Sequence, residues 1–320
     1  MLKPLLNLIR KRPILAIFEV CLRCNSACGY CDLPLNKGRE ELTREEIRSI
    51  FSDLYAQGIR FVFLQGGEPL VRRDLIEIIR DLHEIGLHIT LITNGTRLSE
   101  KLVSQLKSIP VHISISLDTL DRDKYKLIRG ADQLPEVLAG MQRLQDYPHP
   151  KFLTCIVTQQ NLGSVDVVTQ FAKDNGFIPV VGAYHWGVGR YGRDDPTLKY
   201  QRTQAVQLFE RLLATDQVPK GYYREYLKDN VHWLSGGKLN PCDAGRYSIA
   251  IDSSGNVAPC LALPHGGNLL ESSLTEILDN FDQDEIHQCS DRSSCNMVCS
   301  RIIGSVLRKP TLAVSNWLNT

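Results

Sequence analysis

The chain has 320 residues, of which 43% are hydrophobic, and this length and composition suit one large α/β domain with a smaller second one. Its 37 Lys and Arg residues are balanced by 36 Asp and Glu residues without a long block of either sign, so no basic field argues for nucleic acid as a partner. No apolar run approaches the roughly 18 residues that a transmembrane helix needs.

The cysteine content bears on the compartment. Ten cysteines would form disulfides only in an exported protein. The N-terminus does not resemble an export signal, because the basic residues at positions 10–12 follow the short apolar run instead of preceding it. We therefore expect a cytoplasmic protein whose cysteines bind metal.

Residues 1–13 form the first predicted element, an amphipathic segment. Its apolar residues fall at helical spacing and are Leu2, Leu5, Leu6 and Ile9. With Lys3, Arg10 and Lys11 beside them, such a helix could lie on a membrane surface or cap the domain that follows. Capping is the favoured interpretation.

The apolar, β-rich run Ile14–Val20 predicts a buried strand, and three cysteines follow it within eight residues, at Cys24, Cys28 and Cys31. Three thiolates at this spacing can share one metal centre. Zinc in a structural site would require a fourth ligand, which Cys21 could supply, whereas an iron-sulfur cluster can keep one iron open.

The spacing Cys-x3-Cys-x2-Cys, with Tyr30 before the last cysteine, resembles the cluster motif of the radical S-adenosylmethionine (radical SAM) family. The resemblance implies that Cys24, Cys28 and Cys31 hold a catalytic 4Fe-4S cluster whose open iron binds S-adenosylmethionine (SAM), and that Cys21 takes no part. It also implies an α/β fold, a partial (β/α)6 TIM-like barrel with its chemistry at the carboxyl ends of the strands.

The next elements agree with such a barrel. Thr43 and Glu46 make a capping box for a helix that ends near Gly58. Five further apolar runs predict buried strands at Phe61–Leu64, Leu87–Thr93, Val111–Leu117, Phe152–Thr158 and Ile178–Ala183. Amphipathic segments predict helices at Asp74–Ile85, Ser99–Lys107, Leu134–Gln145, Val165–Asn175 and Thr203–Leu213. This alternation is typical of parallel βαβ units.

Gly66, Gly67, Glu68 and Pro69 directly follow the second predicted strand. A glycine pair there lets a ligand approach the backbone, and Glu68 can accept a hydrogen bond from an ammonium group. The segment resembles the radical SAM segment that holds the methionyl amino group of SAM. The alternative is a plain turn from strand to helix.

Polar residues also end the third and fourth predicted strands. Asn94 follows the third, and Ser116 and Asp118 share one face at the end of the fourth. Such side chains could hold a ribose or a carboxylate, although any barrel mouth is polar. This stretch, with Arg129 beyond it, resembles radical SAM enzymes that carry an auxiliary cluster domain, which implies that Ser116 and Arg129 help to bind SAM.

The sixth predicted strand leads to His185, which is a candidate substrate contact or, equally, a hydrogen-bonded structural histidine. Its neighbours at the expected barrel mouth are Trp186, Gly187, Gly189 and Arg190. No residue is assigned a catalytic role from the sequence.

The composition changes after about residue 215, where aromatic and turn residues lead into a cysteine-rich part. Cys242 and Cys260 flank residues that predict a hairpin turning at Ser253–Asn256. This pattern resembles the opening of SPASM and twitch auxiliary domains, and the last three cysteines resemble the later SPASM cluster; they are Cys289, Cys295 and Cys299.

Five thiols cannot complete two four-cysteine clusters. We therefore expect one auxiliary 4Fe-4S cluster on Cys242, Cys260, Cys299 and either Cys289 or Cys295, with a second, partly ligated cluster or a zinc site as alternatives.

The predicted organisation is an N-terminal segment (1–13), a barrel (14–215), an auxiliary cluster domain (216–301) and a tail (302–320). The resemblance implies an enzyme that cleaves SAM reductively to a 5'-deoxyadenosyl radical, which takes hydrogen from a substrate. A maturase that cross-links, epimerises or oxidises a peptide is favoured, although there is little room before Ile14 for a leader-peptide domain. An enzyme acting on a sugar or another small molecule is the alternative, and a non-catalytic iron-sulfur or zinc protein a remote one. An electron donor such as flavodoxin or ferredoxin is an expected partner.

Overall fold

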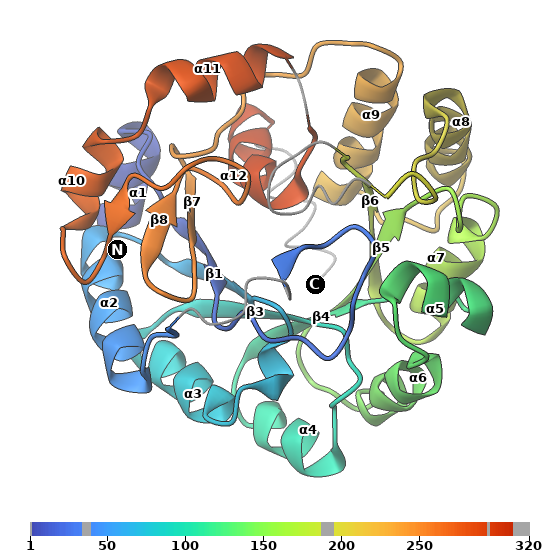
Figure 1. Cartoon of the computed structure of the whole chain (residues 1–320), viewed down its shortest axis with the longest axis horizontal. Coiled ribbons are helices and arrows are strands. Elements are labelled where there is room, and N and C mark those ends of the chain that lie inside the picture. The colour runs from blue at the N-terminus through green and yellow to red at the C-terminus, as the bar shows by residue number, and fades with distance from the viewer. Residues whose placement is uncertain (1, 34–39, 187–194, 293–294, 310–320) are drawn as a thin grey trace.

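The computed structural model describes residues 2–33, 40–186, 195–292 and 295–309 (Figure 1). Their strands form one sheet in the order β6-β5-β4-β3-β2-β1-β7-β8-β9. Six of them run parallel as the barrel: β1 Leu15–Glu19, β2 Phe61–Gln65, β3 His88–Thr93, β4 Val111–Ser116, β5 Lys151–Val157 and β6 Ile178–Ala183. The predicted α/β class and partial six-stranded barrel are confirmed.

Helices surround the curved sheet on its outer side (Figure 1). Those of the barrel part are α1 Leu2–Ile9, α2 Arg44–Gln57, α3 Leu75–Ile85, α4 Glu100–Lys107, α5 Arg122–Arg129, α6 Leu134–Arg143, α7 Val165–Asp174 and α8 Arg202–Leu213. The predicted capping box forms at α2, where Thr43 Oγ1 accepts from Glu46 N and the Glu46 carboxylate accepts from Thr43 N. Gly58 ends that helix in the left-handed conformation, at a φ of 113°.

β1 is an interior strand of the sheet and part of the core. All five residues of β1 are buried, and β1 pairs in parallel with β2 on one side and with β7 (Ser248–Ile251) on the other. A parallel strand that is covered on both faces is read from sequence as a continuous apolar run, which is why this strand was predictable. No helix in the described ranges is long and apolar enough to span a bilayer.

The C-terminal part continues the sheet of the barrel. The predicted hairpin is confirmed: β7 pairs antiparallel with β8 (Asn256–Ala258), and Asp252 Oδ1 accepts from the turn amides of Ser254 and Asn256, each at 2.9 Å. A short strand, β9 (Gly267–Asn268), completes the edge.

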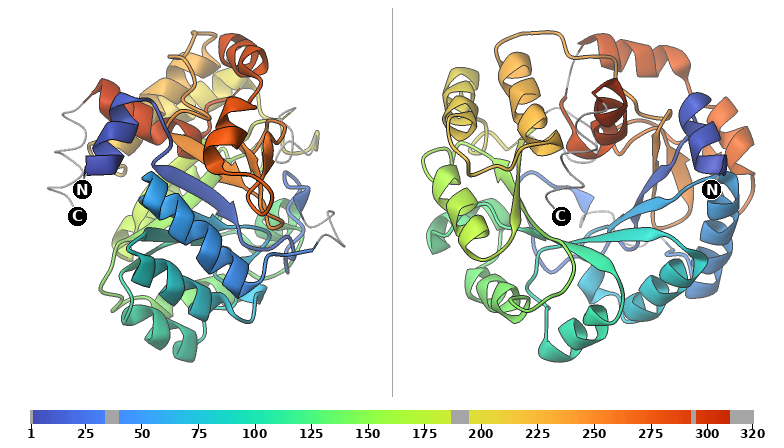
Figure 2. Two further views of the ribbon diagram at one scale, coloured as in Figure 1. Left: turned by 90° about the vertical axis from the view of Figure 1, so that its left-hand side faces the viewer. Right: turned by 180° about the vertical axis from the view of Figure 1, so that it is seen from behind.

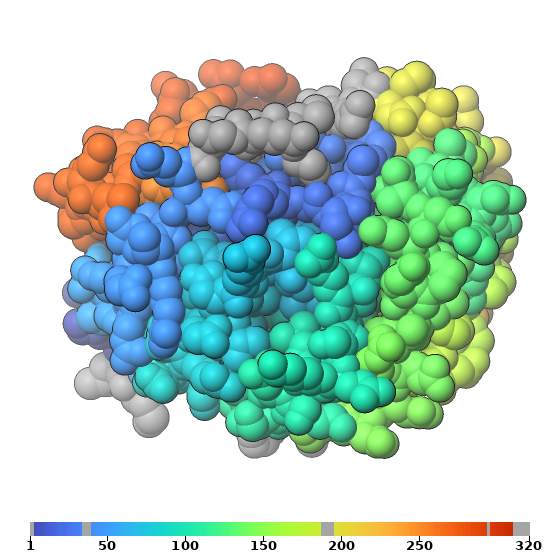
Figure 3. Space-filling model, turned by 60° about the horizontal axis from the view of Figure 1, so that its bottom comes forward, coloured from blue at the N-terminus to red at the C-terminus, as the bar shows by residue number. Residues whose placement is uncertain are grey.

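Four helices of this part were not predicted. They are α9 Tyr222–Leu234, α10 Leu274–Asp279, α11 Gln283–Arg292 and α12 Val298–Arg308. The α9 helix packs against α8, so the chain crosses the proposed domain boundary near residue 216 between two neighbouring helices. Figure 3 shows the orange C-terminal part next to the blue early chain, which in turn borders the cyan and green middle of the barrel.

Candidate functional site

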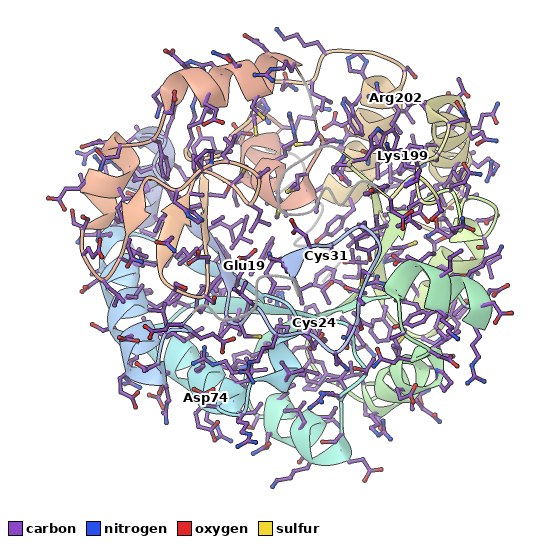
Figure 4. All side chains as sticks on the ribbon, viewed as in Figure 1. Glu19, Cys24, Cys31, Asp74, Lys199 and Arg202 are labelled. Carbon is purple, nitrogen blue, oxygen red and sulfur yellow. The ribbon has the colours of Figure 1, made fainter. Side chains whose placement is uncertain are left out.

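The cysteine loop follows β1 at the carboxyl end of the strand, where parallel barrels carry their chemistry. Cys24, Cys28 and Cys31 line one cavity of about 240 Å³. Cys21 is not among its lining residues: it is fully buried, and its Sγ lies 3.4 Å from the carbonyl oxygen of Glu68. Figure 4 labels Cys24 and Cys31, which lie near the middle of the ring of strands. The structure thus separates Cys21 from the other three thiols.

Burial raises the pKa of these thiols. The pKa is about 11 for Cys24 and about 12 for Cys31. Burial also raises the pKa of Cys28, although the positive charge of the nearby Arg129 guanidinium opposes this shift. The thiolate is the form that binds metal, so loading must release protons. No three His, Cys, Asp or Glu side chains of the described residues can share a single metal ion. An iron-sulfur cluster accepts a wider spacing, because each thiolate binds its own iron.

The main chain of Gly67 and Glu68 holds the cysteine loop against the end of β2. Gly67 N donates to Cys21 O and Glu68 N to Arg23 O, both at 2.8 Å. A Cβ atom on Gly66 would lie 2.3 Å from Cys21 O, and one on Gly67 would lie 2.3 Å from Arg23 O. The absent side chains therefore make room for the loop backbone, whereas the sequence suggested that they make room for a ligand.

Asn94 fastens the same loop to the end of β3. Its Nδ2 donates to Asn25 Oδ1 at 2.8 Å and to Ser26 Oγ at 3.2 Å. Gln133, next to the start of α6, donates to Asn25 O at 3.1 Å and accepts from Ser26 Oγ at 3.0 Å. Asn94 lines the cavity, and its amide positions the loop between Cys24 and Cys28.

Glu68 is buried and already well bonded. Its carboxylate accepts from Thr93 Oγ1 at 2.6 Å, from Asn94 N at 2.7 Å and from Leu70 N at 2.9 Å. A carboxylate has about four acceptor positions, so these bonds leave room for one further donor. Burial raises the pKa of Glu68, which the hydrogen bonds oppose. Pro69 starts the short 3-10 helix Pro69–Val71 and does not line the cavity.

Asp118 and Arg129 form a buried pair beside the cysteine loop. Arg129 Nε forms an ion pair with Asp118 Oδ2 at 2.7 Å, and the carboxylate accepts hydrogen bonds from Tyr30 Oη at 3.1 Å and from Ile156 N at 2.8 Å. Arg129 lines the cavity, and its buried Nη2 has no hydrogen-bond partner among the described residues. An unpaired guanidinium nitrogen there can receive an anionic ligand group, such as a carboxylate. Asp118 does not line the cavity, whereas Ser116 does.

A second cavity, of about 280 Å³, lies in the C-terminal part. Four thiols line it: Cys242, Cys260, Cys289 and Cys295. This set differs from the expected one, which included Cys299. Burial raises the pKa of Cys295 to about 12 and that of Cys260 further. Arg292 and Arg301 line the same cavity.

Cys299 lines a third cavity, of about 190 Å³, which opens between the barrel and the C-terminal helices. This cavity and the cysteine-loop cavity share four lining residues, which are Tyr30, Gln65, Thr154 and Ile156. Its other walls are mostly apolar or aromatic and include Val180, Tyr184, Tyr226, Leu261, Met297 and Val298. Sequence reasoning missed Tyr226, because the helix that carries it was not predicted.

His185, the candidate substrate contact or structural histidine of the sequence analysis, also lines this third cavity. Burial lowers its pKa to about 4, although a hydrogen bond to the main chain of Asn296 opposes the shift. The imidazole is therefore neutral at physiological pH. Three further residues that the sequence placed at this mouth, Gly187, Gly189 and Arg190, lie outside the described residues.

Comparison with known proteins gives two family matches. Residues 18–172 match the family described as "Radical SAM superfamily", and residues 242–301 match the SPASM family, described as "Iron-sulfur cluster-binding domain". A PqqA peptide cyclase from Rhizobium meliloti (strain 1021) is 29% identical over 83% of this chain and 73% of its own. A GTP 3',8-cyclase from Aliarcobacter butzleri (strain RM4018) is 30% identical over 76% of this chain and 78% of its own.

Among solved structures, Streptococcus suis SuiB bound to S-adenosylmethionine is similar in fold, with a TM-score of 0.69 and 18% identity. The match covers 90% of this chain and 71% of that one.

Proposed function

Because the chain belongs to the radical SAM superfamily and carries a SPASM iron-sulfur domain, we propose that it is a maturase that modifies a peptide at an uncharged side chain. Its cofactors are 4Fe-4S clusters and SAM. Bound together, they supply a 5'-deoxyadenosyl radical that takes a hydrogen atom from the substrate. The name of the PqqA peptide cyclase relative supports a peptide substrate.

Under this proposal, Cys24, Cys28 and Cys31 hold the catalytic cluster, and the cavity they line receives SAM. The residues that would contact SAM line the same cavity and are Gly66, Gly67, Glu68, Asn94, Ser116 and Arg129. The free Nη2 of Arg129 suits the SAM carboxylate, and the remaining acceptor position of Glu68 suits its ammonium group. Asp118 acts indirectly, by positioning Arg129.

The uncharged character of the third cavity is the observation that carries the choice of substrate. Since it shares Tyr30, Gln65, Thr154 and Ile156 with the cysteine-loop cavity, a side chain bound there lies next to the radical source. No described residue that lines it carries a charge at neutral pH, because burial keeps His185 neutral. An aliphatic or aromatic side chain is complementary to such walls, whereas a triphosphate would lack cationic partners.

The auxiliary domain takes a different part in the proposal. We assign its single four-iron cluster to Cys242, Cys260, Cys289 and Cys295, and leave Cys299 free to face the substrate. The cavity of these thiols shares Met297 with the third cavity, and the cluster serves substrate turnover. The proposal also includes a domain boundary near residue 216. It further includes an electron donor of the flavodoxin or ferredoxin type as a partner.

A small anionic substrate is the second candidate. It is favoured by Arg292 and Arg301, which line the auxiliary cavity beside four thiols, and by the name of the GTP 3',8-cyclase relative. Such a substrate would contact the auxiliary site instead of the apolar cavity.

Deuterium transfer distinguishes the two candidates. The anaerobically reconstituted enzyme is given SAM, reductant and either peptides whose central Leu, Phe or Tyr is deuterated in its side chain, or deuterated GTP. Deuterium in 5'-deoxyadenosine from an apolar peptide, and not from matched peptides with central Asp or Lys, is the expected result. Transfer from GTP alone would assign the enzyme to the second candidate.

A further inference from the structure

The N-terminal helix α1 turns its apolar side to solvent. The exposed fractions are 56% for Leu5, 40% for Leu6 and 70% for Ile9. At about 100° per residue these three side chains lie on one side of the helix. The sequence favoured a helix that caps the barrel, and these three apolar side chains do not make such a contact.

The polar side of α1 makes the contact with the protein instead. Asn7 Nδ2 donates to Pro13 O and to Gln57 O, each at 3.0 Å, and Lys3 Nζ donates to Ala56 O at 2.7 Å. Gly58 allows this approach, because a Cβ atom there would lie 2.3 Å from Asn7 Nδ2. The helix is therefore fixed by hydrogen bonds in an orientation that leaves its leucines and isoleucine outside.

Basic residues accompany the exposed apolar side. Arg10, Lys11 and Arg12 are exposed and follow the helix directly, and no acidic residue precedes Glu19, in a chain whose net charge is only +1. Lys11 adopts the left-handed conformation, with a φ of 54°, as Arg12 N donates to Asn7 O at 2.7 Å. Glycine would take this helix-ending conformation without steric cost. The chain has Lys11 at this position instead, which adds a third positive charge to those of Arg10 and Arg12.

We propose that α1 and Arg10–Arg12 bind the surface of an anionic lipid membrane. Leu5, Leu6 and Ile9 would enter the boundary between head groups and acyl chains while the cations contact anionic head groups. Apolar and basic groups together match this surface, since a purely apolar protein partner would not need the cations. Figure 2 shows α1 at the opposite end of the barrel from the cysteine loop, so a membrane bound here leaves the catalytic cavity facing away from the lipid.

Vesicle sedimentation with the full-length, cluster-loaded protein tests this proposal. We expect binding to vesicles of phosphatidylcholine with phosphatidylglycerol, weakened by salt, and little binding to phosphatidylcholine alone. Leu5→Ser/Ile9→Ser should weaken binding at least tenfold, and so should Arg10→Gln/Lys11→Gln/Arg12→Gln. The matched control is Leu127→Ser/Val167→Ser, which removes apolar side chains that are 52% and 55% exposed elsewhere on the barrel and should leave binding unchanged.

Three outcomes would overturn the proposal. One is that the wild-type protein fails to bind the anionic vesicles, or that both α1 variants bind them as tightly as the wild type does. Another is a dimer that forms without lipid and is lost in Leu5→Ser/Ile9→Ser, because the face would then cover a second copy. The last is that the protein binds vesicles only when it carries Leu312→Ser/Trp317→Ser. That result would assign the apolar face of α1 to the chain's own C-terminal segment. Formation of 5'-deoxyadenosine without vesicles should stay at the wild-type level in both α1 variants, which shows that they fold.

Discussion

Arg129 Nε lies 2.7 Å from Asp118 Oδ2, and only 6% and 0% of the two side chains are exposed. The pair connects α5 to the loop after β4, and Arg129 Nη1 also lies 3.9 Å from the sulfur of Cys28. One buried cation therefore depends on one buried carboxylate while it faces the candidate cluster ligands.

Removing that carboxylate should be costly. Asp118→Asn leaves the charge of Arg129 buried without its counter-ion, and such a loss typically destabilises a protein by about 3 to 5 kcal/mol. The exposed pair Arg122–Asp132, at 2.7 Å, provides the control, since Asp132→Asn should cost under about 1 kcal/mol. Urea unfolding followed by circular dichroism measures both. Equal free energies of unfolding for the two variants would show that the buried pair adds nothing.

Glu68 should matter for SAM affinity. A charge-assisted hydrogen bond is worth about 1.5 to 3 kcal/mol, so Glu68→Ala should weaken SAM binding by about ten- to a hundredfold. The variant also frees Thr93 and Asn94 N, and Thr93→Val serves as the control because it removes one bond to the carboxylate and keeps the charge. Calorimetric titration should place Thr93→Val close to wild type. If the two variants lose affinity equally, Glu68 acts only by holding the loop.

His185 should make the protein sensitive to acid. Its pKa falls from 6.5 to about 4 on folding, so the unfolded chain binds the proton more readily between these values. The neutral histidine contributes stability that is fully present above pH 6.5 and is lost as the pH falls toward 4. At about 1.4 kcal/mol per pKa unit, this contribution is about 3 kcal/mol. In His185→Gln the free energy of unfolding should decline less over this window, and an unchanged decline would show that other groups cause it.

Iron content tests the assignment of the auxiliary thiols. Cys242→Ala/Cys260→Ala should lower iron from about eight to about four per chain, since one four-iron cluster is lost, while 5'-deoxyadenosine still forms. Cys299→Ala is the matched control and should keep about eight, because its thiol lines a different cavity. A fall to about four irons in Cys299→Ala would restore the ligand set that the sequence suggested.

The barrel could be predicted from the sequence because its signals are local. β1 and β6 appear as apolar runs, and the capping box of Thr43 and Glu46 marks the start of α2 within the chain itself. The pairing of β1 with β7 could not be predicted, since residues more than 200 positions apart in the sequence leave no local pattern when they pair.

The site, like the fold, could be predicted only where its signal is local in the sequence. The spacing of Cys24, Cys28 and Cys31 identified three thiols that line one cavity. The sequence did not show which later thiols share a cavity, because this depends on two helices that were not predicted. Cys289 lies in α11 and Cys299 in α12, and the two thiols line different cavities. The role of the glycines at positions 66 and 67 likewise became visible only when the loop backbone was seen against them.

Formation of 5'-deoxyadenosine by single-cysteine variants tests most directly whether Cys24, Cys28 and Cys31 form the radical-generating site. After anaerobic reconstitution with iron, sulfide, SAM and reductant, the wild type and Cys21→Ala should form it, because the Cys21 thiol does not line the cavity. Alanine at any of the other three positions should abolish it. Loss of the product in a correctly folded Cys21→Ala, or its persistence in Cys28→Ala, would contradict the three-ligand site.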